Sequence, residues 1–173
     1  RVNAPLVNQC FAFLKQGRKA NIQGRDIGAG LVSTIEKLKA STVPDLIGKL
    51  SDWLSKETAK ENAKRFPSET RIEALRDRVD CLVCFTEQAN EVADVVRKIQ
   101  SVFTDDKTSA GIKLSSIHRS KGLEAKNVFI LQPKGVGPRE DKMMEWERQQ
   151  EENLRYVACT RAIDTLTYVN DRQ

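Results

Sequence analysis

The sequence predicts an α/β protein in which a parallel sheet is flanked by helices and carries a small all-helical insertion. Apolar runs at residues 112–115, 127–131 and 165–169 have the length and residue types of strands. The middle run is almost wholly apolar, as is typical of a parallel strand that is covered on both faces. By contrast, residues 31–85 show helical spacing of their apolar side chains.

The first elements of the chain follow from apolar spacing and from proline and glycine positions. A helix is predicted over residues 5–15, because a proline opens an amphipathic stretch there and a glycine follows its end. A short strand is predicted over residues 20–23. Closely spaced glycines after this strand predict a loop, at Gly24, Gly28 and Gly30.

A run of helices comes next. Ser68 is placed to cap one of them, since a serine before an apolar helical pattern is a common N-cap. The predicted helices cover residues 31–39, 44–65, 68–84 and 87–103. A polar loop is predicted after them, at residues 104–110.

The C-terminal part returns to short strands. Between its last two strands the sequence predicts a loop over residues 132–141 and a helix over residues 144–159. We therefore expect residues 1–30 and 86–173 to form one α/β domain. Residues 31–85 are then the helical insertion, a reduced accessory subdomain.

Length and charge set broad limits. A chain of 173 residues fits one domain with a modest insertion. The net charge of +5 suits contacts with phosphates, but it does not by itself establish nucleic-acid binding. The sequence has no signal peptide and no apolar stretch as long as a membrane span, so we expect a cytoplasmic protein without a membrane partner.

The cysteines predict packing rather than a metal site. Cys81 and Cys84 form a C-x-x-C pair, but no second pair follows and the single histidine is distant in sequence. Both cysteines lie in an apolar run with helical spacing. Reduced thiols in the core are therefore favoured over a zinc or redox pair, and no metal ligands are assigned.

The segment 116–124 carries a dense set of polar groups directly after a predicted strand. Ser116, His118, Lys121 and Glu124 offer a hydroxyl, an imidazole, an ammonium and a carboxylate, and a glycine precedes the carboxylate. Hydroxyl and backbone N–H groups can hold phosphates, and a carboxylate can accept a hydrogen bond from a ribose hydroxyl. The alternative for the lone histidine is a structural hydrogen bond.

The segment 151–162 predicts the end of a helix, with Thr160 and Arg161 at its last turn. A surface ion pair is the ordinary role of an arginine. The functional alternative is an arginine finger, a guanidinium that stabilises charge on a transferring γ-phosphate.

These two segments, in this order, resemble motifs V and VI of the UvrD/Rep-like superfamily 1 DNA helicases. The resemblance implies that the sheet belongs to the second of two RecA-like, P-loop NTPase-type domains. The opening residues 1–5 are similar to the R-x-N-A element of the same domain. The chain departs from the family pattern at Ser116, where threonine is commoner, and at Ala125, where many members have an aromatic residue.

The resemblance also implies roles for single residues. Ser116 and His118 would contact DNA, as would Arg1 and Asn3 of the R-x-N-A element. Three further residues would contact ATP, with the last of them as the catalytic arginine finger: Gly122, Glu124 and Arg161.

The activity implied is that of an ATP-dependent DNA helicase, of 3′–5′ polarity in most relatives. The sequence lacks G-x-x-x-x-G-K-[S/T] and a Walker B strand, so ATP and Mg²⁺ would be held mainly by an N-terminal RecA-like domain. This chain would then be inactive alone. The alternatives are a non-catalytic DNA- or protein-binding module with a RecA-like fold, a helicase–nuclease subunit with its nuclease carboxylates elsewhere, and, least favoured, a small zinc protein.

Overall fold

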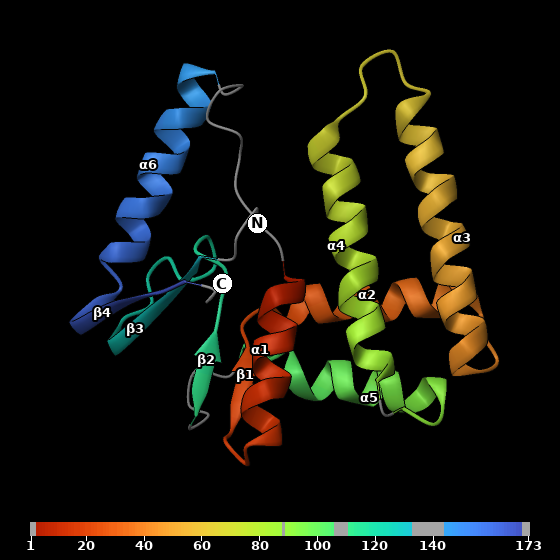
Figure 1. Ribbon diagram of the computed structural model, residues 1–173, viewed down its shortest axis with the longest axis horizontal. Helices are drawn as coiled ribbons and strands as arrows, with labels where there is room; N and C mark the ends of the chain where they lie inside the picture. Colours follow the sequence, from red (N-terminus) through yellow and green to blue (C-terminus); the bar gives the residue numbers. More distant parts are fainter. Residues whose placement is uncertain (1–2, 88, 106–110, 133–143, 171–173) are drawn as a thin grey trace. The chain divides into compact units, whose positions relative to one another are not determined.

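The computed structural model of the chain describes residues 3–87, 89–105, 111–132 and 144–170 (Figure 1). Contacts divide the chain into two compact units, Arg1–Leu114 and Ser115–Gln173. The described residues form helices α1 (Ala4–Lys15), α2 (Arg25–Leu38), α3 (Val43–Asn62), α4 (Glu69–Thr86), α5 (Val92–Val102) and α6 (Glu145–Cys159). Their strands are β1 (Ala20–Ile22), β2 (Ile112–Leu114), β3 (Ala125–Gln132) and β4 (Ala162–Asn170).

The first unit is built around one apolar core. Phe85 of α4 lies at its centre, fully buried, with the ring of Phe11 edge-on at 5.1 Å and the ring of Phe103 at 6.0 Å between centroids. The short strands β1 and β2 pair in parallel at one side of the helices, with Ile22 opposite Leu114 (Figure 1). The helices predicted from apolar spacing are confirmed, and their inward faces make this core.

The loop predicted at Gly24, Gly28 and Gly30 is wrong, because α2 begins at Arg25 and includes the last two glycines. Gly24 stands just before the helix with a φ of 139°, a conformation that favours glycine. Gly28 lies inside the helix, at a position where a Cβ would meet the Cβ of Phe103 at 2.7 Å, so that a larger residue would not fit without a shift. Here the glycine permits close packing rather than a turn.

Capping explains where two other helices begin. Ser68 caps α4 as predicted, with its Oγ accepting a hydrogen bond from the N–H of Arg71 at 3.3 Å. Helix α5 begins at Val92, later than the predicted start at residue 87. The carboxylate of Asp94 accepts hydrogen bonds from the N–H groups of Asn90 and Glu91, at 3.2 and 3.1 Å, which fixes the N-cap at Glu91.

A buried carboxylate holds the turn between α3 and α4. Glu61 is only 4% exposed. Its carboxylate lies 2.6 Å from Nζ of Lys64 and 3.2 Å from Nε of Arg71, and it accepts a 3.4 Å hydrogen bond from the N–H of Ser68. The hydrogen bond from Lys64 lowers the pKa of Glu61; burial opposes this, and the charges of both bases add to it. The turn therefore depends on the ionised carboxylate.

We expect Glu61→Gln to destabilise the first unit at neutral pH and to have no effect in acid. Because the folded pKa of Glu61 is depressed, its contribution is present above the ordinary glutamate pKa, about 4.3. That contribution is lost as the pH falls through the folded pKa. The check is urea denaturation of both proteins across this range. Glu57→Gln is the matched control, since Glu57 also bonds a lysine at 2.6 Å but is more exposed. A pH-independent difference would contradict the assignment.

The C-x-x-C cysteines lie on the side of α4 that faces the core, as predicted for reduced thiols that pack there. Cys81 is 1% exposed, and this burial raises its thiol pKa. Cys84 is half-buried, with its thiol donating to Oδ1 of Asn8 at 3.1 Å. Burial likewise raises the pKa of Cys10, to about 11. All are free cysteines whose environment favours the neutral thiol at physiological pH.

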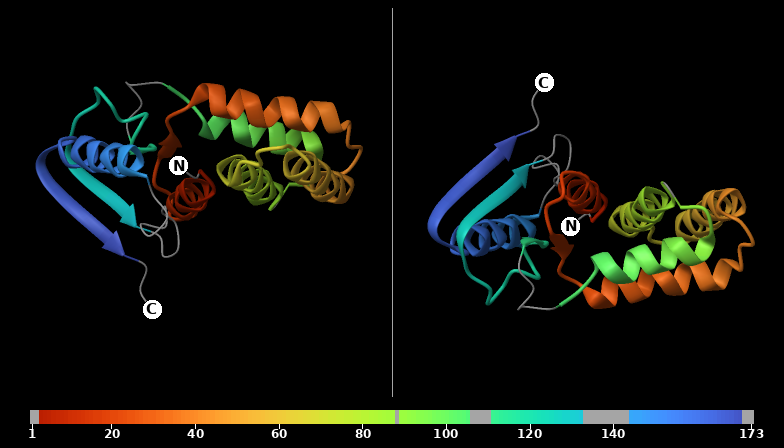
Figure 2. Two further views of the ribbon diagram at one scale, coloured as in Figure 1. Left: turned by 90° about the horizontal axis from the view of Figure 1, so that it is seen from above. Right: turned by 90° about the horizontal axis from the view of Figure 1, so that it is seen from below.

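The second unit is a β–α–β arrangement. Strand β3 pairs in parallel with β4, with Phe129 opposite Thr167, and α6 lies along one face of this pair (Figure 2). The prediction that residues 127–131 are covered on both faces is wrong for this chain, because Phe129 is 64% exposed. Ile163 of β4 is equally exposed, at 64%.

The described strands form two separate parallel pairs, β1–β2 and β3–β4. A mixed α/β fold is confirmed, while one complete RecA-like sheet and the insertion at residues 31–85 stay predictions. The predicted loop at 132–141 lies almost wholly outside the described residues. Over the described part of the chain, none of the helices has both the length and the apolar character needed to cross a membrane.

Candidate functional site

The segment between β2 and β3 is a compact turn that is held by its own backbone. The carbonyl oxygen of Ser116 accepts hydrogen bonds from the N–H groups of Arg119 and Ser120, both at 3.0 Å. The carbonyl oxygen of Ser120 in turn accepts from the N–H of Leu123 at 2.9 Å. These bonds fix the path of the residues that precede Glu124, so their side chains share one rigid base.

Gly122 is required by the backbone of this turn. Its φ is 81°, in the left-handed region that other residues seldom adopt. A Cβ at this position would meet no atom within 4 Å, so the space around it is open. The conformation of the chain, and not local crowding, therefore explains the glycine, and the open space leaves its backbone accessible.

Arg161 lies just beyond the end of α6, and its guanidinium is held by three hydrogen bonds. Nη1 donates to the carbonyl oxygen of Leu123 at 3.0 Å. Nε donates to the carbonyl oxygen of Val157 at 2.9 Å, and Nη2 donates to Oγ1 of Thr160 at 2.9 Å. Within the described residues no carboxylate pairs with Arg161, and its three printed partners are uncharged oxygen atoms.

The contact at Leu123 brings the two predicted segments together. Leu123 stands between Gly122 and Glu124, and the backbone adds a second link, from the N–H of Ala125 to the carbonyl oxygen of Arg161 at 3.0 Å. The side chain of Glu124 is exposed. The three residues predicted to face ATP thus come from one small region, which combines a guanidinium, a solvent-facing carboxylate and an accessible backbone.

Thr160 is the support of this arrangement. Its Oγ1 accepts the bond from Arg161 and lies 3.0 Å from the carbonyl oxygen of Tyr156, to which it donates. The hydroxyl therefore links the guanidinium to the last turn of α6. Tyr156 itself is 71% exposed, so its side chain does not brace the arginine.

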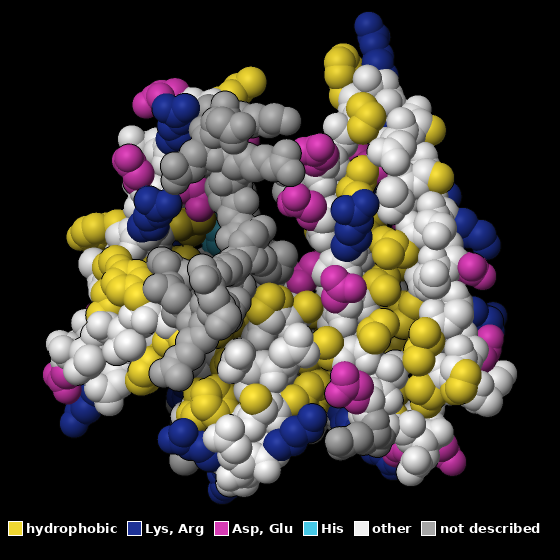
Figure 3. All heavy atoms as spheres, viewed as in Figure 1, with side chains coloured by type: hydrophobic (Ala, Val, Ile, Leu, Met, Phe, Trp, Pro, Cys, Tyr) yellow, Lys and Arg dark blue, Asp and Glu magenta, His cyan; other side chains and the backbone are white. Residues whose placement is uncertain are grey.

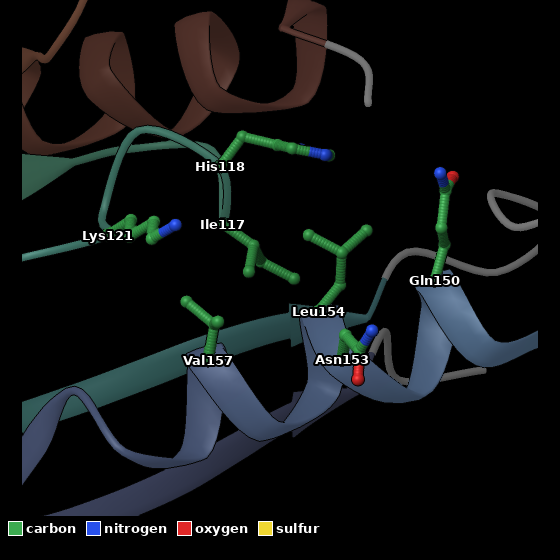
Figure 4. Close-up of a pocket in the computed structure, with 7 residues that line it drawn as sticks. All are labelled: Ile117, His118, Lys121, Gln150, Asn153, Leu154 and Val157. Carbon is green, nitrogen blue, oxygen red and sulfur yellow. The ribbon is translucent and has the colours of Figure 1, made fainter.

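The predicted DNA-facing residues of this unit are in the same turn. Ser116 is half-buried and His118 is exposed. His118 lines a hollow of about 300 Å³ between the turn and α6 (Figure 4). Among the described residues, no side chain or backbone group forms a hydrogen bond with the imidazole of His118.

Asn3 belongs to the first unit, where it is tied to α4. Its N–H lies 2.8 and 2.9 Å from the two carboxylate oxygens of Asp77, and its Nδ2 donates to one of them at 3.2 Å. Asp77 also accepts a hydrogen bond from the N–H of Ala4 at 2.9 Å, and so this residue of α4 caps the start of α1. Sequence reasoning missed Asp77, because no local pattern marks a contact across 74 residues. Arg1 lies outside the described residues.

On the face shown in Figure 3, the charged side chains along α3 and α4 do not form a patch of one sign. Lys, Arg, Asp and Glu side chains are interspersed along α3 and α4 in the space-filling view (Figure 3). Several are paired along the helices, such as Lys49 with Asp45 and Lys60 with Glu57. The case for a nucleic-acid site therefore depends on the turn at residues 116–124.

Comparison with known proteins agrees with this arrangement. The model of the UvrD-like helicase C-terminal domain family matches residues 33–172, which include the turn and Arg161 but not Asn3. DNA helicase II of Escherichia coli (strain K12) is 32% identical to this chain over 130 residues, covering 67% of the chain. The chain spans only 18% of that relative's length. Because the family match extends over most of the sequence and includes both motif segments, the chain belongs to the UvrD-like helicase C-terminal domain family.

Proposed function

We propose that this chain is the second motor half of an ATP-dependent DNA helicase and supplies the arginine finger. The observation that carries the proposal is the position of the Arg161 guanidinium, held at the carbonyl of Leu123 between Gly122 and Glu124. A cation that is anchored by neutral acceptors keeps its charge available for a phosphate. Such preorganised charge is how phosphoryl-transfer enzymes stabilise their transition states.

On the nucleotide side, three groups fit ATP. Arg161 would meet the γ-phosphate, Glu124 would accept a hydrogen bond from a ribose hydroxyl, and Gly122 would let the backbone approach closely. Mg²⁺ would be held by the N-terminal domain of the same protein. Among the described residues of this chain, no three metal-ligating side chains gather that could hold the ion.

On the DNA side, Ser116 and His118 would contact one strand from the same turn that reaches ATP. Arg1 and Asn3 of the first unit would also contact DNA. Closure of the two motor halves on ATP and their reopening after hydrolysis would then move the protein along the strand, in the 3′–5′ direction.

A cytoplasmic location stays a prediction.

The test is DNA-stimulated ATPase activity of this chain and of its full-length product, measured side by side. We expect activity only in the longer protein, because the phosphate-binding loop and the metal ligands would come from the other half. Hydrolysis by this chain alone would contradict the division of the site. No hydrolysis by either protein would favour the alternative of a DNA- or protein-binding module that retains the fold.

A further inference from the structure

Asn3 stands at the N-cap of α1 but does not cap it. An asparagine at this position ordinarily turns its side-chain oxygen back onto the N–H groups of the first helical turn. Asn3 makes no such bond, and the first turn of α1 contains no acidic residue. The capping acceptor comes instead from α4, where the carboxylate of Asp77 accepts from the N–H groups of Asn3 and Ala4. The side chain of Asn3 is thereby released from the ordinary role of its position.

The polar groups of Asn3 can be accounted for one by one. Its N–H donates to Asp77, and its carbonyl oxygen accepts a hydrogen bond from the N–H of Val7 at 3.0 Å. Its Nδ2 also donates to Asp77, at 3.2 Å. Because Asp77 holds the nitrogen end of the amide, the acceptor Oδ1 is turned away from that carboxylate. No described residue donates to Oδ1, and Asn3 is only half-buried.

The carboxylate of Asp77 does more than join two helices. It is 9% exposed, and burial of a carboxylate is costly unless hydrogen bonds compensate it. The two backbone N–H groups of Asn3 and Ala4 would be enough to tie α1 to α4. The third group, Nδ2 of Asn3, adds the orientation of a side chain to this tie. Only a group whose two oxygens both accept can hold all three donors at once.

We propose that Asp77 is a positioning residue, which orients the amide of Asn3 for contact with single-stranded DNA. This inference rests on the proposed function, in which Asn3 contacts DNA. Asp77 would not touch the strand itself, because its charge repels phosphates. The acceptor Oδ1 fits an N–H donor on the edge of a base, since the phosphates of DNA offer only acceptors.

The test is a double-mutant cycle on the affinity for single-stranded DNA, measured by fluorescence anisotropy with the chain in its full-length product. Asn3→Ala should weaken binding about fivefold, the scale of one hydrogen bond. Asp77→Asn keeps the size of the side chain but replaces one acceptor oxygen by a donor, and it should weaken binding by about the same factor. The double variant should bind no more weakly than either single variant, because Asp77 acts through Asn3.

The sign of the effect separates positioning from charge. Loss of a negative charge near DNA by itself favours binding, because the phosphates are repelled less. Asp80→Asn is the matched control, since it removes the same charge from an exposed position of α4, and it should not weaken binding. Far-UV circular dichroism checks that each variant is folded. Asp77→Glu keeps both acceptor oxygens on a longer side chain, and it takes the place of Asp77→Asn in the cycle if that variant unfolds.

Each other outcome counts against the inference. Additive losses in the double variant would mean that Asp77 acts by another route, and would refute positioning. Normal affinity of the Asp77 variant beside a weakened Asn3→Ala would do the same. Unchanged affinity of Asn3→Ala would refute the contact at Asn3, while the proposed contacts of Ser116 and His118 would stand. Failure of the unaltered protein to bind single-stranded DNA would refute the proposed function itself.

Discussion

Arg161→Ala should lower kcat for DNA-stimulated ATP hydrolysis by about 10³- to 10⁵-fold in the full-length protein, the range for loss of an arginine finger. At about 1.36 kcal/mol per factor of ten, this is roughly 4 to 7 kcal/mol of transition-state stabilisation. The affinity for single-stranded DNA should stay the same, because the proposed DNA contacts are made by Ser116 and His118 and not by Arg161. Steady-state kinetics and DNA binding on the same preparations provide the measurement.

Lysine should not restore the activity. The three hydrogen bonds of Arg161 run in three directions, to Leu123, Val157 and Thr160, and a guanidinium can make them together because its donors form a rigid fork. An ammonium is a single point of charge and cannot reproduce this anchoring. Arg161→Lys is therefore expected to fall close to Arg161→Ala in kcat.

Arg155→Ala is the control for general loss of charge, since it removes an exposed arginine from the same helix. Its melting temperature and that of Arg161→Ala should both be recorded, because the bond to Leu123 also joins α6 to the turn. Normal DNA-stimulated hydrolysis by a folded Arg161→Ala protein would refute the finger assignment. Equal losses in both variants would show that charge, and not position, carries the effect.

The sequence predicted the polar side chains of the candidate site, and the roles assigned to them stay predictions. The string from Ser116 to Glu124 and the helix end at Arg161 contain the chemical groups, and their side chains are visible in the sequence. It could not predict how the two segments meet. The acceptor at Leu123 is a main-chain carbonyl, which every residue carries, so no residue type marks it. The hollow beside the turn was missed for a related reason, since the α6 residues Leu154 and Val157 that line it have the spacing of any apolar helix face.

The fold shows the same division between local and distant causes. Helices with regular apolar spacing and a capping serine were predicted nearly to their ends, because those signals act within one turn. The start of α2 was missed because Gly28 is needed for contact with Phe103, which is far along the chain. The burial of β3 was not predicted correctly. An apolar strand indicates only that burial of both its faces would be favourable, and the side chain of Phe129 remains exposed.

The second large effect concerns the core of the first unit. Phe85→Ala should lower its free energy of unfolding by about 3 to 5 kcal/mol, the usual cost of truncating a buried phenylalanine. Phe85 is completely buried. The alanine variant loses the edge-on ring contact with Phe11 and the ring contact with Phe103. Since small domains are stable by only about 5 to 15 kcal/mol, this removes a large part of the total. Urea denaturation followed by far-UV circular dichroism measures it.

Phe66→Ala makes the matched control, because it deletes the same side chain at a site that is 80% exposed. Among the described residues, its ring contacts the guanidinium of Arg65, 5.5 Å from the ring centroid, and such exposed contacts are worth about 0.5 to 1 kcal/mol. The urea midpoint of Phe66→Ala should therefore stay near that of the unaltered chain, while Phe85→Ala shifts it strongly at an unchanged slope. Equal shifts would mean that Phe85 does not organise this core. The difference between two phenylalanines in one unit thus isolates burial as the cause, since composition and chemistry are the same in both variants.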